Sequence, residues 1–194
     1  MEKQDESLRG INLQEIERQG INLQGKLVYL RLMTDDDTDL IVKWRNNDRV
    51  RNNFIYQKPF TRQGHENWIR TMIETGSAVQ FIICENDTDK PVGSVYFRDI
   101  NEEHHRAEYG IFIGDDAATG KGIGTEAAKL AVTYGFKVMK LHKITLRAFA
   151  DNEGALKSYQ NAGFVREALL KEEVCIQGSY RDIVLMGIIN PYEK

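Results

Sequence analysis

Hydrophobic and polar residues alternate along this chain with two periods, one of two residues and one close to 3.6 residues. The two-residue period predicts strands. We expect strands over residues 26–33, 78–84, 92–100, 105–113, 143–149, 164–176 and 182–189. Helical spacing predicts four helices, which begin near Thr34, near Thr61, after the glycines that precede residue 125, and at Asn152. Residues 46–53 end the helix that begins near Thr34. The order is β, α, α, β, β, β, α, β, α, β, β, and we find no linker in it, which predicts one mixed α/β domain.

Residues 1–25 differ from the rest of the chain. They are polar and contain the segment Gly-Ile-Asn-Leu-Gln twice, at 10–14 and 20–24. Two copies are too few for a solenoid. We therefore expect an N-terminal appendage over residues 1–25, formed by a helical turn or a packed tail, and a single domain over 26–194.

Composition narrows the possible partners and the cellular location. The 194 residues include 26 Lys and Arg against 29 Asp and Glu, a net charge of −3, so no strong positive field exists to hold a nucleic acid. Cys84 and Cys175 are far apart and form no CxxC motif, which argues against a zinc site or a disulfide framework. The N-terminus lacks the apolar core of a signal peptide, and apolar runs fall short of the ~18 residues of a membrane span. We expect a reduced, cytoplasmic protein without a metal, a nucleic acid partner or a membrane partner.

The first candidate site is the segment Thr119-Gly120-Lys121-Gly122-Ile123-Gly124-Thr125-Glu126, between a strand and a helix. Glycines let the backbone approach a ligand closely, and the unpaired N–H groups of a helix N-terminus attract anions. The segment matches neither a Walker A loop nor a complete GxGxxG fingerprint. It is therefore either a phosphate cradle or only a tight strand-to-helix turn.

The second candidate segment spans 152–164, with the sequence Asn-Glu-Gly-Ala-Leu-Lys-Ser-Tyr-Gln-Asn-Ala-Gly-Phe. Asn152 is a good N-cap and Gly163 a good helix stop. By itself the segment is also typical of a short, well-delimited helix with a packed tyrosine.

Together the two segments resemble the GNAT superfamily of acetyl-CoA-dependent N-acetyltransferases. That family has a Gln/Arg-x-x-Gly-x-Gly/Ala loop before its central helix and, about thirty residues later, Asn-x-x-Ala-x-x-x-Tyr-x-x-x-Gly-Phe. Both patterns are present here in that order, and the element order from residue 26 onward also matches. The segments Arg106–Ile111 and Gly178–Asp182 are similar to the branch of spermidine acetyltransferases and ribosomal-protein N-terminal acetyltransferases. Thr119 departs from the family, which usually has Gln or Arg there.

The resemblance implies a fold with a central, splayed, mostly antiparallel sheet flanked by helices, and acetyl-CoA as co-substrate without a metal. It assigns the diphosphate of CoA to the loop and the pantetheine arm to the strand before the loop and to Asn152. The residues so assigned are Ile111, Ile113, Thr119, Gly120, Lys121, Gly122, Gly124, Thr125, Asn152 and Tyr159.

The implied chemistry is direct attack of a neutral amine on the thioester. A lysine-like amine has a pKa of ~10.4, so about 1 in 2,500 molecules is neutral at pH 7, a cost of ~4.6 kcal/mol. The resemblance places Tyr159 beside the CoA sulfur as general acid and the backbone N–H of Ile111 as an oxyanion donor. Glu108 is our candidate base, directly or through water; the alternative is a salt bridge with Arg106 or Lys143.

The acceptor is the least determined part of the hypothesis. A polyamine, a protein N-terminal amine and an amino-sugar nucleotide all fit the branch, with a polyamine slightly favoured. The resemblance places Arg45, Asn46, Asn47, Asn53 and Tyr56 near the acceptor. Two alternatives are not acetyltransferases: a CoA-binding module without catalysis, and a protein whose loop binds another nucleotide. Relatives often associate, so a homo-oligomer is possible.

Overall fold

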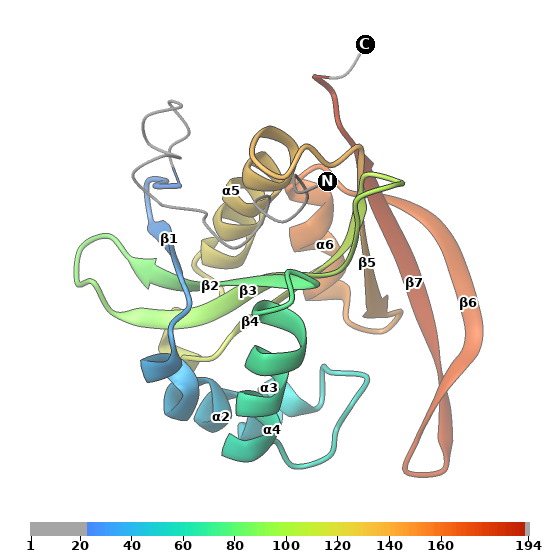
Figure 1. Ribbon diagram of the computed structural model, residues 1–194. Coiled ribbons are helices and arrows are strands. Elements are labelled where there is room, and N and C mark those ends of the chain that lie inside the picture. Colours follow the sequence, from blue (N-terminus) through green and yellow to red (C-terminus); the bar gives the residue numbers. More distant parts are fainter. Residues whose placement is uncertain (1–22, 193–194) are drawn as a thin grey trace, which may run out of the picture.

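The computed structural model describes residues 23–192, which form a seven-stranded sheet with helices on both faces (Figure 1). The strands are β1 (Val28–Leu32), β2 (Ala78–Glu85), β3 (Pro91–Asn101), β4 (Arg106–Ile113), β5 (Lys143–Phe149), β6 (Val165–Ile176) and β7 (Ser179–Ile189). The helices are α2 (Thr38–Asn46), α3 (Asp48–Arg51), α4 (Arg62–Trp68), α5 (Ile123–Lys137) and α6 (Glu153–Asn161), with short turns η1 (Asp35–Asp37) and η3 (Asp116–Ala118) and a π-helical segment η2 (Ile69–Ile73).

The predicted fold class and the order of the predicted elements are confirmed. Helix α3 was not predicted, since it lies inside the stretch expected only to end the first helix. The helix predicted to begin near Thr61 continues past Trp68, but its last part, η2, has a π-helical geometry that was not predicted. Asn47 starts α3 because its side chain accepts the backbone N–H of Arg49 at 2.9 Å. The predicted appendage over 1–25 lies almost entirely outside the described residues.

The sheet has the order β1-β2-β3-β4-β5-β7-β6, and every neighbouring pair is antiparallel except β4–β5. The parallel pair is short: it joins Arg106–Glu108 of β4 only to Lys143–Thr145 of β5. Beyond Glu108 the two strands diverge, so the rest of β4 has no strand on that side. The backbone N–H and C=O groups on that side of β4 therefore need hydrogen-bond partners other than a strand. The predicted splay of the sheet is therefore located at the centre of the molecule.

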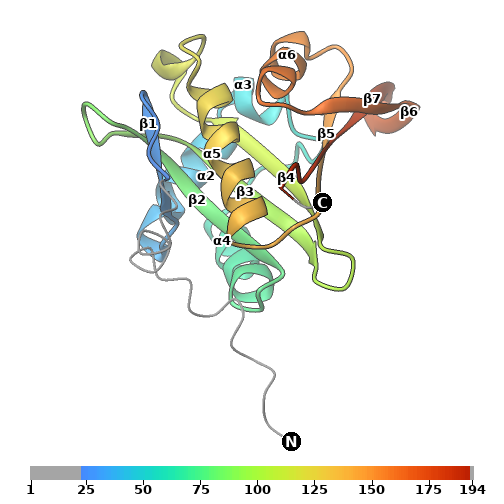
Figure 2. The same cartoon turned by 90° about the horizontal axis from the view of Figure 1, so that it is seen from above.

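Two apolar cores lie on the two faces of the sheet, and Figure 2 shows α5 lying across one of these faces. The larger one packs α5 and α6 against the sheet, and small residues on α5 (Ala127, Ala128 and Ala131, all fully buried) let the helix lie close to the strands. The smaller one gathers Ile41 and Trp44 of α2 around Phe112 of β4. Successive residues of β4 thus face different cores: Tyr109 and Ile111 pack in the larger one and Phe112 in the smaller one.

A single carboxylate fixes the start of α5 against β1. Glu126, in the first turn of α5, accepts the backbone N–H groups of Lys26, Leu27 and Val28 at 2.9, 2.7 and 2.9 Å. Burial works to raise the pKa of Glu126, but these three bonds outweigh it and hold the pKa below its ordinary value. The end of the glycine loop that leads into α5 is therefore held against the start of β1.

Candidate active site

The glycine loop before α5 adopts a backbone conformation that requires glycine. Gly120 and Gly122 have φ angles of +74° and +82°, in the left-handed region. Gly122 is the N-cap residue of α5, and no side chain caps this helix end. The N–H groups of the first turn are consequently free to bind an anion, in line with the helix dipole.

A cavity of about 660 Å³ runs from this loop to Tyr159, in the opening between β4 and β5. Every predicted cofactor-binding residue lines this cavity except Lys121, which is exposed beside it. The lining residues from that prediction are Ile111, Ile113, Thr119, Gly120, Gly122, Gly124, Thr125, Asn152 and Tyr159. The space beside Gly124 is open, since a Cβ there would meet nothing closer than Ser158 Oγ at 3.7 Å. The loop therefore has the shape and the donors that a diphosphate fits.

The free side of β4 supplies backbone groups to the same cavity. Arg49 Nη2 donates to the carbonyl of Ile113 at 2.9 Å, so this carbonyl faces away from β3. Because backbone groups alternate along a strand, the N–H and C=O of Ile111 point the same way, into the opening. Ile111 can therefore pair with an extended ligand, whereas the carbonyl of Ile113 is held by Arg49.

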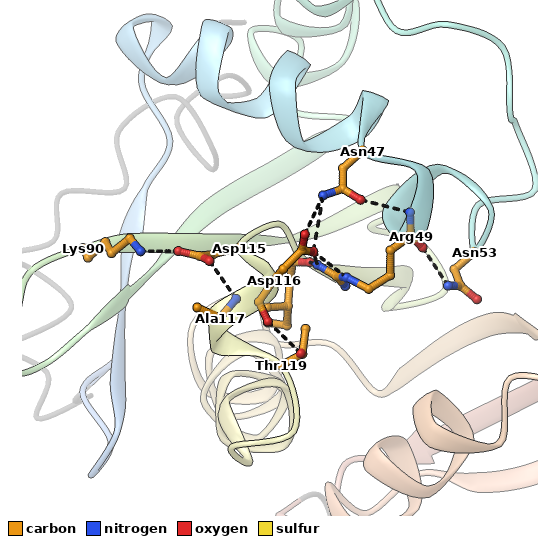
Figure 3. Close-up of polar contacts among 9 residues, drawn as sticks. Asn47, Arg49, Asn53, Lys90, Asp115, Asp116, Ala117 and Thr119 are labelled. Atoms are coloured by element: carbon orange, nitrogen blue, oxygen red, sulfur yellow. Dashed lines mark hydrogen bonds and ion pairs between the residues drawn. The ribbon is translucent and has the colours of Figure 1, made fainter.

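A polar network beside the loop was not predicted from the sequence (Figure 3). Asp116 accepts hydrogen bonds from Arg49 Nε at 2.7 Å and from Asn47 at 3.3 Å, and the Thr119 hydroxyl donates to the Asp116 carbonyl at 2.8 Å. Thr119, at the position that departs from the family pattern, thus stabilises the turn. Arg49 also lines the cavity, so it brings a cationic side chain to this wall. No sequence motif marked it, because it comes from the unpredicted helix α3.

Asn152 connects the two sides of the cavity. Its Oδ1 accepts the N–H of Ala155 at 3.2 Å, which confirms the predicted N-cap, and its Nδ2 donates to Asn53 Oδ1 at 2.8 Å. Thr125 and Ser158 hydroxyls are also hydrogen-bonded to each other, at 2.9 Å. The end of α3, the start of α5 and α6 are thereby held around one opening.

Tyr159 lies at the far end of the cavity in an aromatic cluster. Its ring packs edge-on against Tyr109 and Phe164, with centroid distances of 6.4 and 6.2 Å. Burial, with a smaller contribution from Tyr96, raises the pKa of Tyr159 above its ordinary value of 10.0. The phenol is therefore protonated at neutral pH and available as a hydrogen-bond donor.

Glu108 forms ion pairs, but not with the partners that we expected. It lies between Arg98, at 2.6 Å, and Arg147, at 3.1 Å, whereas Lys143 pairs with Glu167 at 2.8 Å. Both carboxylate oxygens are engaged, and Glu108 is not part of the cavity lining. Taking a proton from an amine would require an arginine to move or a water molecule to intervene.

A second cavity of about 280 Å³ lies on the other face of β4 and shares Phe54 and Phe112 with the first. Arg45 and Tyr56, two of the predicted acceptor residues, line it. Asn46, another predicted acceptor residue, instead ties the end of α2 to Phe60: its Oδ1 accepts the Phe60 N–H and its Nδ2 donates to the Phe60 carbonyl.

Other residues have structural roles. His104 and His105 lie in the β3–β4 turn. Within residues 23–192, no cluster of His, Cys, Asp and Glu could hold a metal ion, and no helix is long and apolar enough to cross a membrane.

The comparison with known families decides the family of the chain. The profile of the acetyltransferase (GNAT) domain matches residues 28–165. The chain belongs to the GNAT acetyltransferase family. The resemblance inferred from the two motifs is thus confirmed.

Individual relatives agree with this family. The chain is 42% identical to a spermidine N(1)-acetyltransferase of Escherichia coli over 106 residues, 55% of this chain and only 56% of that protein. It is 30% identical to a probable N-acetyltransferase of Bacillus subtilis, YjcK, over 89% of this chain and 99% of that protein. The crystal structure of spermidine N-acetyltransferase from Vibrio cholerae in complex with CoA and spermine superposes with a TM-score of 0.79 at 27% identity, covering 86% of this chain and 97% of that one.

Proposed function

We propose that this protein transfers the acetyl group of acetyl-CoA to a primary amine. The observation that carries the proposal is the cavity between β4 and β5, which joins an uncapped helix N-terminus to a protonated phenol. The residues that fit CoA are the loop 119–125 for its diphosphate, Ile111 for its extended arm, and Tyr159 for its sulfur end.

Three groups of this chain then serve the chemistry. The N–H of Ile111, on the free side of β4, stabilises the oxyanion. Tyr159 donates a hydrogen bond to the sulfur as the thiolate leaves. Glu108 accepts the proton of the amine through water, because both of its oxygens are already paired with arginines.

Relatives support a polyamine as an acceptor class. Two proteins similar to this chain, from E. coli and V. cholerae, are spermidine N-acetyltransferases, and the V. cholerae structure contains spermine. A protein N-terminal amine remains the alternative acceptor within the same reaction.

The same relatives extend the proposal to assembly. A structure of the V. cholerae enzyme is dodecameric, and here the β6–β7 hairpin exposes Val165, Leu169 and Ile189. We therefore include self-association in the proposal. A reduced, cytoplasmic setting is also part of it, because Cys84 and Cys175 are both free thiols.

A thiol-release assay tests the reaction. Acetyl-CoA is incubated with the protein and a panel of polyamines, short peptides and amino sugars, and free CoA thiol is measured. Release that depends on an amine supports the proposal. Calorimetric binding of CoA without release from any amine would instead identify a CoA-binding module, and competition by ATP but not by CoA would identify another nucleotide site.

A further inference from the structure

The cavity on the α2 side of β4 has an unusual charge for a pocket that accepts amines. Its lining contains Arg45, Lys58 and Arg98, and no Asp or Glu among the described residues. Arg98 is already neutralised by Glu108, at 2.6 Å. Arg45 and Lys58 have no ion-pair partner within residues 23–192, so the pocket carries uncompensated positive charge.

Arg45 is the deeper of these two cations. Its guanidinium lies over two aromatic rings, with Cζ 3.2 Å from the centroid of Phe54 and 5.2 Å from that of Phe60. Its Nη1 is buried and has no hydrogen-bond partner among the described residues. Burial lowers the pKa of Arg45 to about 10, so the side chain is still a cation at neutral pH. A buried charge without a partner is costly unless a ligand completes its bonding.

A second buried group points to the same conclusion. His65 is 1% exposed and lines this cavity; its Nδ1 is bonded to Thr38 Oγ1 at 3.1 Å, while its Nε2 has no partner in the described part of the chain. The neighbouring Trp68 is satisfied by Gln80 at 3.0 Å. The buried polar atoms of this cavity without a hydrogen-bond partner among the described residues are Arg45 Nη1, His65 Nε2 and Arg98 Nε. Both arginine atoms are donors, and His65 Nε2 is a donor in the tautomer in which Nδ1 accepts the Thr38 hydroxyl, so the set suits an acceptor oxygen.

We propose that Arg45 binds an anionic group of the acceptor, so that a primary amine carrying a carboxylate is acetylated better than a polyamine of the same length. This inference rests on the proposed function. Because Phe54 and Phe112 line both cavities, the two cavities are neighbours, and an acceptor that extends from one to the other places its amine toward the thioester and its carboxylate toward Arg45. A diamine would bring a second ammonium group to the same guanidinium, where like charges repel.

The test compares acceptors that differ only at the distal group. A series of ω-amino carboxylates is assayed against the diamines and the alkylamines of the same chain length, in the wild type, Arg45→Met and Arg45→Lys. Arg70→Met is the matched control, since Arg70 is exposed, outside both cavities and bonded to Asn67. Two peptides that differ only in Asp or Asn after the N-terminal residue are assayed as well. A faster rate with the Asp peptide would show that the anionic group can belong to a peptide and not only to a small molecule.

We expect kcat/KM for the carboxylate member to exceed that of the diamine by at least ~10-fold, the lower end for hydrogen bonds to charged groups. Arg45→Met should abolish the preference, Arg45→Lys should keep part of it, and Arg70→Met should leave it intact. Equal rates, a preference for the diamine, or a preference that survives in Arg45→Met would overturn the inference. If Arg45→Met does not fold, the comparison in the wild type decides.

A binding measurement keeps this result separate from the proposed function. Unreactive alkyl carboxylates are titrated onto the CoA-loaded protein by calorimetry. Binding that Arg45→Met weakens by ~10-fold or more supports the anion subsite even if no amine releases thiol, whereas undetectable or unchanged binding refutes it.

Discussion

The replacement of Tyr159 by phenylalanine removes only the hydroxyl that we place beside the CoA sulfur. An ordinary thiol has a pKa of ~8.5 and an ordinary phenol ~10, so complete proton transfer from Tyr159 to a thiolate is uphill by ~2 kcal/mol. Burial makes it harder still, because it raises the pKa of Tyr159. The phenol then acts mainly as a hydrogen-bond donor to a developing charge, which is worth ~1.5–3 kcal/mol.

This magnitude translates into a loss of kcat of roughly 10–150-fold in Tyr159→Phe, at the low end of what general acids contribute. The assay is thiol release at saturating acceptor, with CoA affinity measured separately by calorimetry and expected to change little. Since the donating form of Tyr159 persists above its ordinary pKa of 10.0, its ionisation should cause no loss of rate up to about pH 9.

Tyr109→Phe is the matched control for this experiment. Tyr109 is also buried, packs against Tyr159 and has a hydroxyl without a partner among the described residues, but it does not line the cavity. Its loss should leave kcat within about twofold, since Tyr109 does not line the cavity in which we place the thioester. Full activity in Tyr159→Phe, or equal losses in both variants, would refute the reasoning and make Tyr159 a packing residue.

Three further predictions concern the loop and its support. Gly124→Ala should keep the melting temperature and weaken CoA binding in calorimetry, because its Cβ makes only ordinary contacts, with Ser158 Oγ at 3.7 Å and Ile113 Cγ1 at 3.9 Å, but occupies the space of the ligand; unchanged affinity would place the diphosphate elsewhere. Gly122→Ala should lower the free energy of unfolding by ~1–2 kcal/mol, measured by urea denaturation, because its φ of +82° strains an L-residue; an unchanged midpoint would contradict that strain. Glu126→Gln should cost ~1–3 kcal/mol at neutral pH. The pKa of Glu126 is lower in the folded protein than in the unfolded chain, so its stabilising contribution is present above about pH 4.3 and is lost as the pH falls toward the folded pKa. The free energy of unfolding of Glu126→Gln should therefore fall less steeply in acid than that of the wild type. Identical pH profiles of the two proteins would exclude the effect.

Most of the fold could be predicted because local patterns and tertiary packing agree. Thr61 and Asn152 cap the helices that they were expected to start, and β5 begins and ends at the predicted residues. Helix α3 was missed since four residues carry no detectable period, and Asn47 at its start is equally typical of a loop. The π-helical turn after Trp68 was missed because its apolar spacing is close to that of an ordinary helix.

The candidate site was predictable where glycines and motif positions define it, and not where it depends on side chains from distant segments. Gly120 and Gly122 follow from the need for positive φ. Arg49 could not be found, because its role comes from a contact with Asp116, which is 67 residues away along the chain. The arginine partners of Glu108 were missed for the same reason: strand pairing places Arg98 opposite Glu108, and the sequence alone does not state that register.

A crystal structure with acetyl-CoA or CoA bound tests the central claim most directly. We expect the diphosphate on the backbone N–H groups of residues 120–125, with the sulfur within hydrogen-bonding distance of the Tyr159 hydroxyl. Coenzyme bound with its diphosphate away from the start of α5, or no coenzyme at saturating concentration, would contradict it.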